Sequence, residues 1–354
     1  MQIINESSAK LKIAKAEKIS KKMDVFYNPV MGLNRDISVL LLSSINKKNL
    51  QIADPLAATG VRSIRFLKEL NKNKIKKIYI NDNNKNAIKS IKKNFVFNKI
   101  FFHKNKKIII KNQDANLFLL NSAGFDYIDI DPFGSPNFLL DSACKRIARD
   151  GVLAVTATDT SALCGASPKA CMRKYWAVPT RDAIMHETGL RILIRKIQLV
   201  AAQYEKALIP IFSYSKEHYM RIFFRNYKGK SNVDEILKHH EYFNEAGPMW
   251  IGSLWNKYLC NKILNNAIKN KIFKNNMDLI KFLKMIRDES KIKNVGFYDL
   301  DDICKKNKIK NLQKKELIID RIKKLGYGAS ETHFKGQGVR SDIPLKNLIK
   351  IVKK

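Results

Sequence analysis

Asp126-Tyr-Ile-Asp-Ile-Asp-Pro-Phe-Gly-Ser-Pro136 is the stretch of this 354-residue chain that carries most information about its fold. Its apolar residues are dense and follow no helical stripe, which is typical of a buried parallel strand. Proline cannot donate a hydrogen bond to a neighbouring strand, so the strand should end at Pro132. A carboxylate, Asp131, and a ring, Phe133, are therefore expected at the carboxyl end of a strand, where open α/β sheets bind ligands.

The segments on both sides of this stretch alternate between strand-like and helix-like patterns. We expect strands at residues 52–53, 77–80, 107–110 and 151–157, and helices at about 61–70, 87–91 and 139–148. Strands interleaved with helices at this spacing predict a doubly wound, parallel α/β sheet. The sheet should be completed by an antiparallel strand pair at 208–212 and 218–224, which follows a long helix at 181–206. His186 and Glu187 are interpreted as residues on the face of that helix.

Three other strand ends carry small or acidic residues. Asp54 begins a turn of small residues that runs to Gly60 and enters a helix, which would allow a ligand to approach closely. Asp82 follows the next strand, where a carboxylate can bind ribose hydroxyls in this fold. Asp114 follows the third strand. Each of these acids could instead cap a helix, and the pattern suits NAD as well as S-adenosylmethionine.

The turn at Asp131 favours S-adenosylmethionine. Asp-Pro-Phe resembles the (Asp/Asn)-Pro-Pro-(Tyr/Phe) turn of enzymes that methylate the exocyclic amines of bases. Such an amine is a poor nucleophile because its lone pair is delocalised into the ring. A carboxylate that accepts its N–H bonds localises that electron density and orients the lone pair. A neighbouring aromatic ring can stack on the base once the base has left its helix.

The composition points to a polyanionic partner. The chain has 67 Lys and Arg residues against 32 Asp and Glu residues, a net charge of +35. Such a charge repels itself unless a partner such as nucleic acid neutralises it. The chain is also rich in Lys, Ile and Asn, as an AT-rich genome would produce, so part of the excess can be solvated surface.

Other features of the sequence exclude several protein classes. No apolar run approaches the ~18 residues that span a bilayer, and residues 1–23 are basic and lack the apolar core of a signal peptide. We therefore expect a cytoplasmic protein without a membrane partner. The five cysteines are scattered and never form a C-x-x-C pair, which argues against disulfides and a cysteine zinc site. The alternation at residues 11–14 predicts either an edge hairpin or part of a basic arm on RNA.

A second, smaller α+β domain is expected after the polar segment 227–235. We place a methyltransferase-type domain at residues 1–228 and a C-terminal domain at 229–354. The second would hold amphipathic helices near 253–269, 278–288, 300–306 and 313–325, then a glycine-rich basic hairpin at 326–342. Two helices followed by such a hairpin suit contact with nucleic acid, although a packed appendage with lysines facing water would give the same pattern.

Nearly the whole chain resembles, in order, the tRNA (guanine-26, N2)-dimethyltransferases in their archaeal form. The matching blocks are Val25-Phe-Tyr-Asn-Pro29, Asn34-Arg-Asp36, Ala57-Ala-Thr-Gly-Val-Arg-Ser-Ile-Arg-Phe66, Asn81-Asp82, Asp114-Ala-Asn116, Asp129-Ile-Asp-Pro-Phe-Gly-Ser-Pro136, Thr156-Ala-Thr-Asp159, Gly189-Leu-Arg-Ile-Leu-Ile194, Gly247-Pro-Met-Trp-Ile-Gly252 and Thr332-His-Phe334. The resemblance implies a class I S-adenosylmethionine-dependent methyltransferase sheet. It also implies transfer of one or two methyl groups to N2 of guanine 26 of tRNA.

The resemblance further implies roles for individual residues. The cofactor S-adenosyl-L-methionine would be bound by five of them: Arg35, Arg65, Asp82, Asp114 and Ala115. In the catalytic turn, which includes Pro132, Asp131 would engage the guanine amine, with Phe26 and Phe133 around the base. We expect the enzyme to act as a monomer on tRNA.

Two departures from the family pattern bear on the second domain. Archaeal relatives often carry paired cysteines before the Gly-Pro-aromatic block, and residues 238–246 contain none, so we predict no metal. Glu331 stands where an arginine is expected before Thr332. The alternatives are another methyltransferase of exocyclic amines on RNA bases, or a catalytically idle RNA-binding protein with the same fold. The intact turn at Asp131 argues against the idle protein.

Overall fold

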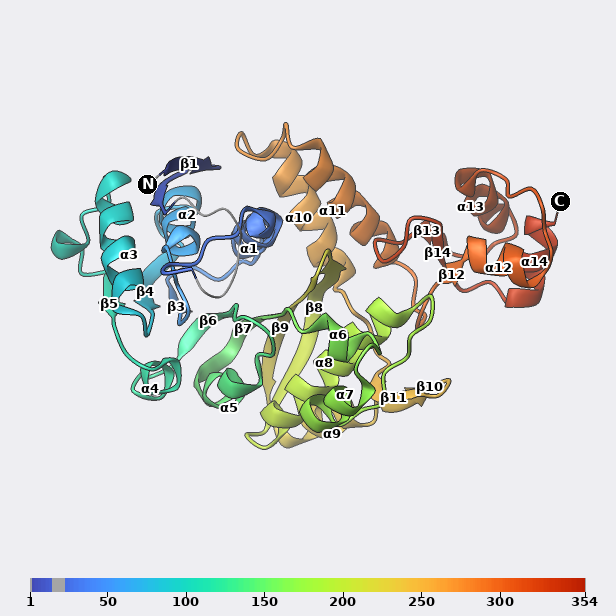
Figure 1. Ribbon diagram of the computed structural model, residues 1–354, viewed down its shortest axis with the longest axis horizontal. Coiled ribbons are helices and arrows are strands. Elements are labelled where there is room, and N and C mark those ends of the chain that lie inside the picture. Colours follow the sequence, from blue (N-terminus) through green and yellow to red (C-terminus); the bar gives the residue numbers. More distant parts are fainter. Residues whose placement is uncertain (1, 15–22, 354) are drawn as a thin grey trace.

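The computed structural model describes residues 2–14 and 23–353 and is built around one seven-stranded sheet (Figure 1). The strand order is β5-β4-β3-β6-β7-β9-β8, with β3 to β7 parallel and β9 antiparallel to both of its neighbours. The strands are β3 (Leu50–Asp54), β4 (Ile75–Asn81), β5 (Ile108–Lys111), β6 (Phe125–Ile130), β7 (Ile147–Ala157), β8 (Lys206–Lys216) and β9 (Tyr219–Lys228). The predicted doubly wound sheet is confirmed.

Helices cover both faces of the sheet. Figure 1 shows α1 (Gly32–Ser44), α2 (Val61–Glu69) and α3 (Lys85–Phe97) above it, and α4 (Ala115–Leu120), α5 (Asn137–Arg146) and α8 (Met185–Ala202) below it. The apolar side chains of β3 and β6 are fully buried between these layers, as expected for parallel strands covered on both faces. The carboxyl ends of β3, β4, β6 and β7 therefore meet at one edge of the sheet.

The N-terminus forms an antiparallel hairpin of β1 (Gln2–Glu6) and β2 (Ala9–Ile13). Two asparagines of the α3 region hold its second strand: Asn98 and Asn94 each accept a hydrogen bond of 2.9 Å from the backbone N–H groups of Lys10 and Lys12. Of the two interpretations of the N-terminus, the hairpin is therefore confirmed. The basic arm would include residues 15–22, which lie outside the described residues.

The segment predicted as a polar domain boundary is helical. Residues 230–237 form α9 (Lys230–Leu237), whose Val233 and Ile236 are buried in the core of the sheet domain. Spacing of three residues between two apolar side chains gives a short helix an inward face. The same core takes in residues from β11 (Ala246–Trp250), which pairs with β10 (His240–Phe243), and from α10 (Lys257–Lys269) and α11 (Met277–Glu289).

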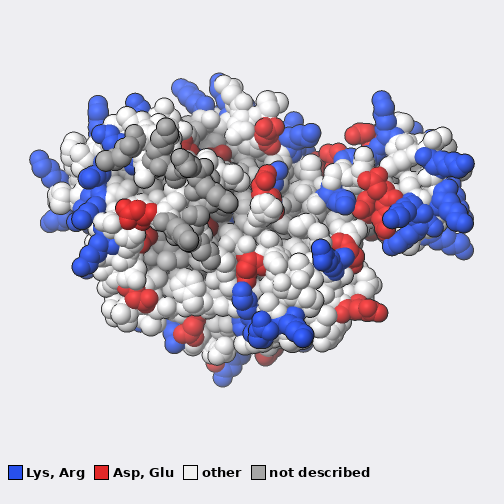
Figure 2. All heavy atoms as spheres, viewed as in Figure 1, with Lys and Arg blue, Asp and Glu red and all other residues white. Residues whose placement is uncertain are grey.

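The C-terminal residues form a lobe with a separate hydrophobic core between residues 300 and 352. It contains β12 (Tyr298–Asp299), α12 (Leu300–Lys306), α13 (Lys315–Lys324), β13 (Ala329–Glu331), β14 (Gly338–Ser341) and α14 (Leu345–Val352). β13 and β14 form the predicted hairpin, and β12 completes a three-stranded sheet. Lys and Arg side chains gather at the free end of this lobe (Figure 2). Within residues 2–14 and 23–353, no helix is both long and apolar enough to cross a membrane.

Candidate active site

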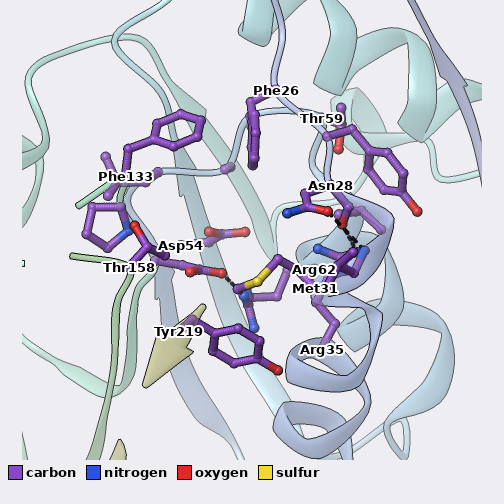
Figure 3. A pocket seen from close by; sticks show the side chains of 18 of the residues that line it. Phe26, Asn28, Met31, Arg35, Asp54, Thr59, Arg62, Phe133, Thr158 and Tyr219 are labelled. Atoms are coloured by element: carbon purple, nitrogen blue, oxygen red, sulfur yellow. Dashed lines mark hydrogen bonds and ion pairs between the residues drawn. The ribbon is translucent and has the colours of Figure 1, made fainter. Parts of the chain in front are cut away.

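The acidic turn predicted from the sequence lies in a cavity of about 430 Å³ at the carboxyl edge of the sheet (Figure 3). Three residues that follow or end sheet strands face it: Asp54, Asp131 and Thr158. Its other walls come from the segment 26–35, from the turn after β3, and from residues 217–219, which form the turn after β8 and the first residue of β9. Segments far apart in the sequence therefore meet where an α/β sheet binds ligands.

A second cavity of about 370 Å³ adjoins the first. Asp82 and Asn84 line the second cavity only, whereas Phe26, Asp131 and Phe133 line both. The catalytic turn therefore stands at the junction of two spaces. Two adjoining cavities that share one carboxylate suit a reaction in which two bound molecules exchange a group.

Asp131 is held by a buried arginine that the sequence analysis did not select. Arg62 is the second residue of α2, and its Nη2 donates to Oδ2 of Asp131. Its Nη1 donates to Ser38 (2.9 Å) and Asn34 (3.1 Å) on α1. The Arg62 side chain is 6% exposed and that of Asp131 is 20% exposed. The carboxylate is therefore fixed on its inner side and open toward the cavity.

The turn after Asp131 is fixed by the neighbouring strand end. Thr158 follows β7, and its Oγ1 accepts a hydrogen bond of 2.6 Å from the N–H of Gly134. The N–H of Thr158 donates in return to the Gly134 carbonyl at 2.9 Å. Gly134 has φ of +74°, a conformation that favours glycine, so this position of the turn requires its residue type.

Asp129, which received no role from the sequence, is structural. Its carboxylate accepts hydrogen bonds from Arg221 at 2.7 and 3.0 Å and from the Tyr127 hydroxyl at 2.5 Å, and all three residues are buried. Burial alone would raise the pKa of Asp129, but the charges of Arg221 and Arg62 outweigh it and lower the pKa. Asp129 therefore stays ionised, and it also forms an ion pair with Arg62 Nη1 at 3.3 Å.

Asp54 is a second carboxyl group on the cavity wall. It accepts a hydrogen bond of 2.7 Å from the Ser63 hydroxyl. Burial, opposed by the charge of Arg62, raises the pKa of Asp54 to about 7. The cavity thus contains two carboxyl groups in different settings, one ion-paired at Asp131 and one titrating near neutral pH at Asp54.

Aromatic residues frame the catalytic turn. The rings of Phe26 and Phe133 meet edge to face with centroids 4.2 Å apart, and Figure 3 shows both beside the cavity. Phe133 is 41% exposed. Pro132 lines the cavity with them. The structure therefore brings together Asp131, Pro132, Phe26 and Phe133, the four residues predicted for catalysis.

Comparison with known proteins identifies the family. The family model of N2,N2-dimethylguanosine tRNA methyltransferases matches residues 6–246 and 238–353. The chain belongs to this family. It is 37% identical to a tRNA (guanine(26)-N(2)/guanine(27)-N(2))-dimethyltransferase of Aquifex aeolicus, over 99% of this chain and 95% of the relative. It is 36% identical to a tRNA (guanine(26)-N(2))-dimethyltransferase of Pyrococcus furiosus, over 99% and 98% of the two chains.

A solved structure of Trm1 from Pyrococcus horikoshii with S-adenosyl-L-methionine has the same fold, with a TM-score of 0.90, 34% identity and full coverage of both chains. The resemblance predicted from the sequence, the class I methyltransferase sheet and S-adenosylmethionine as cofactor are thereby confirmed. The chain is a tRNA methyltransferase.

In this methyltransferase the residues predicted to bind cofactor lie in three settings. Asp82 lines the second cavity, and its two oxygens accept hydrogen bonds of 2.9 Å from the N–H groups of Ala58 and Asn84. Asp114 caps α4 by accepting from two backbone N–H groups, and Ala115 is the first residue of that helix. Neither Asp114 nor Ala115 is among the described residues that line the two cavities.

The two arginines predicted to bind cofactor are tied to the N-terminal hairpin. Arg35 lines the first cavity, and its Nε and Nη2 donate to Glu6 at 2.6 and 2.5 Å. Arg65 is fully buried and pairs with Glu6 (3.0 Å), Asp36 (2.6 Å) and Glu69 (3.0 Å). Arg65 does not line either cavity within the described part of the chain, so in this structure it supports Arg35 through their shared partner.

The structure shows the surroundings of Glu331 and of the cysteines, where the sequence departs from the family pattern. Glu331 pairs with Lys315 at 2.6 Å, inside the C-terminal lobe. All five cysteines are buried and free. Among residues 2–14 and 23–353, no group of three or more His, Cys, Asp and Glu side chains is placed to hold a metal ion.

Proposed function

We propose that this methyltransferase transfers one or two methyl groups from S-adenosyl-L-methionine to N2 of guanine 26 in tRNA. The observation that carries the proposal is the position of Asp131, fixed by Arg62 at the junction of two cavities and next to two aromatic rings. Relatives named for this reaction match the chain over almost its full length.

In the proposed complex, Asp131 accepts hydrogen bonds from the guanine N2 amine and Phe26 and Phe133 contact the flipped base. The carboxylate aligns the amine lone pair, and Arg62 prevents it from rotating away. The Pro132 backbone sets the distance between the carboxylate and the ring that follows it. The second methyl transfer uses the same contacts, because a monomethylated amine still has one N–H to donate.

The second cavity is the space that we propose for the cofactor. We propose that Asp82, Asp114, Ala115, Arg35 and Arg65 form or support its site. The carboxylate of Asp82 borders the second cavity, and each of its oxygens keeps a lone pair for a ribose hydroxyl after its backbone hydrogen bond. Bound S-adenosylmethionine supplies an electrophilic methyl sulfonium, and the chain supplies position and orientation.

The decisive experiment uses unmodified tRNA and labelled S-adenosylmethionine, followed by nucleoside analysis. Dimethylguanosine or monomethylguanosine should form, and a guanine-to-adenine change at position 26 should abolish it. The name of the Aquifex relative includes guanine 27, so the same change at position 27 is the matched control. Label in another base, or label that persists without guanine 26 and disappears without guanine 27, would refute the assignment to guanine 26.

We further propose that residues 1–228 carry catalysis, that residues 229–354 contact tRNA, and that the enzyme acts as a monomer in the cytoplasm. The lysine-rich end of the C-terminal lobe supports the tRNA contact (Figure 2). Light scattering of the purified protein tests the monomer, which an observed mass of twice 40.7 kDa would overturn.

A further inference from the structure

The helix α7 (Pro168–Tyr175) is attached directly to the catalytic turn. The Tyr175 hydroxyl donates to Asp159 at 2.7 Å and lies 3.0 Å from Oγ of Ser135, which belongs to the turn after Asp131. The side chain of Asn137 donates to the carbonyl of Lys174 at 2.8 Å. Tyr175 is fully buried. The position of α7 relative to Asp131 is therefore fixed.

The two sides of α7 differ in chemistry. Cys171 and Tyr175, one helical turn apart, are buried. Lys169, Arg173 and Lys174 are exposed, and Met172 between them is 48% exposed. Lys174 pairs with Asp159 at 3.2 Å, and no ion pair of Lys169 or Arg173 is recorded among the described residues. Figure 2 shows Lys and Arg side chains over the part of this face where Figure 1 places α7.

Trp176 ends α7 in a conformation that large side chains rarely adopt. Its φ is +56°, and its side chain is 51% exposed. The Lys196 Nζ lies 2.9 Å from the centre of its ring, and Arg195 Nη1 donates to its carbonyl at 3.3 Å. A cation packed on one face of an aromatic ring holds the ring in place and leaves the other face free to stack. An exposed tryptophan held in this way is a platform for a base.

Exposed aromatic side chains connect this platform with the cavity. Phe133 at the cavity and Phe138 at the start of α5 are 41% and 56% exposed. Asn137, between them in sequence, is the residue bound to α7. Basic side chains interleaved with exposed rings are the composition of an RNA surface.

We infer that the exposed face of α7, with Trp176 at its end, binds the tRNA segment next to the target guanine. Lys169 and Arg173 contact backbone phosphates, and Trp176 stacks on an unstacked base or on the end of a helix. The inference rests on the proposed function, because it names the second contact that presents the guanine to Asp131.

The test compares two charge reversals with the same change in net charge. The first variant is Lys169→Glu with Arg173→Glu. The control is Lys92→Glu with Lys93→Glu on the exposed side of α3, which covers the opposite face of the sheet. We expect the α7 variant to raise the KM for tRNA at least tenfold and to lower the slope of log KM against log salt by about two. Its kcat and its Kd for S-adenosylmethionine should stay within twofold of wild type.

A third variant, Trp176→Asn, removes the ring but keeps a residue that tolerates positive φ. It should raise the KM for tRNA at least fivefold, with an unchanged salt slope because no charge is lost. Equal KM values and salt slopes for the α7 and α3 reversals would overturn the inference while leaving the reaction intact. Failure of the wild type to methylate guanine 26 would instead overturn the proposed function, and direct tRNA binding would then measure the α7 contact.

Discussion

Two buried charge clusters of similar chemistry differ in whether one of their members reaches solvent. The site cluster consists of Arg62, Asp129, Asp131 and Arg221 under the catalytic cavity. The inter-lobe cluster consists of Glu187, Arg191, Glu289, His333 and Arg340, where α8 and α11 meet the C-terminal lobe. Both have arginines bridging two carboxylates.

The difference lies in a single carboxylate. Every acid of the inter-lobe cluster is at most 1% exposed, and its oxygens are occupied: Glu187 accepts from Arg340 at 2.6 Å and from the Gly296 N–H at 2.9 Å. In the site cluster, Asp129 is sealed in the same way, but Asp131 is 20% exposed and faces the cavity. A sealed ion-pair cluster fixes the relative position of elements, whereas a cluster with one open member presents that member to a ligand.

The largest effect is expected from the open member. Asp131→Ala should lower methyl transfer to tRNA by about 10³-fold or more, because it removes the group that orients the amine. The Kd for S-adenosylmethionine should change little, as measured by titration calorimetry. Because Arg62 loses a partner, thermal unfolding is measured alongside as a control. Transfer close to that of wild type would remove Asp131 from the mechanism.

The sealed cluster should instead affect stability. Arg340→Met leaves Glu187 and Glu289 buried without their shared cation and should reduce the free energy of unfolding by about 3–5 kcal/mol. Urea denaturation measures this loss of unfolding free energy. The matched control is Lys306→Met, which breaks an exposed pair with Asp302 and should leave the free energy of unfolding nearly unchanged, because solvent screens exposed ion pairs. Similar losses in the two variants would show that the inter-lobe cluster does not hold the lobe.

Acid should weaken the sealed cluster through Glu187. Burial alone would raise its pKa, but Arg340 and Arg191 outweigh burial and hold the pKa at about 2, below its ordinary value of 4.5. As the pH falls, this carboxyl group therefore binds a proton in the unfolded chain before it does so in the folded chain. The stabilisation of about 3 kcal/mol is present above pH 4.5 and is lost as the pH falls toward 2. The free energy of unfolding, measured with urea at several pH values, should depend less steeply on pH for Glu187→Gln than for wild type. Identical slopes would assign the acid sensitivity to other carboxylates.

The smallest effect concerns the ring beside the open carboxylate. Phe133→Ala should weaken binding of the target base by about 1–3 kcal/mol, the usual contribution of a stacked base. It should therefore raise the KM for tRNA by roughly 5- to 150-fold, with the Kd for S-adenosylmethionine nearly unchanged. Phe138→Ala, which removes a more exposed ring on α5, is the comparison. A larger effect at Phe138 would move the base contact away from the catalytic turn.

Local patterns predicted the sheet well because strand and helix signals act over a few residues. Leu300–Lys306 was predicted as a helix and is α12, and the strand pair after α8 was found, although both strands are longer than expected. The helix α9 was missed because its two buried residues are surrounded by polar ones. No helix was predicted at α14 either, although Leu348, Ile351 and Val352 form a buried apolar face on it.

The candidate site was predicted in part for a similar reason. Asp54, Asp82 and Asp131 lie at strand ends, and a parallel sheet brings such ends together whatever the rest of the chain does. Arg62 was not selected, although it is inside a quoted motif, because its partners Asn34 and Asp131 are 28 and 69 residues away in the sequence. Tyr219 and the turn before β9 reach the cavity only through the antiparallel pairing of β9 with β7.

The sequence alone determined the sheet, the acidic turn at Asp131, the resemblance to the family and the partner implied by the charge. These depend on local periodicity, on proline and glycine in the turns and on composition. Only the tertiary structure decided which charges are paired and which one faces the cavity. Asp126, Asp129 and Asp131 lie within one short segment, but packing gives them different partners: Lys47 for the first, Arg221 for the second and Arg62 for the third. Burial and long-range ion pairs, which the sequence does not encode locally, make Asp131 the one open to a substrate.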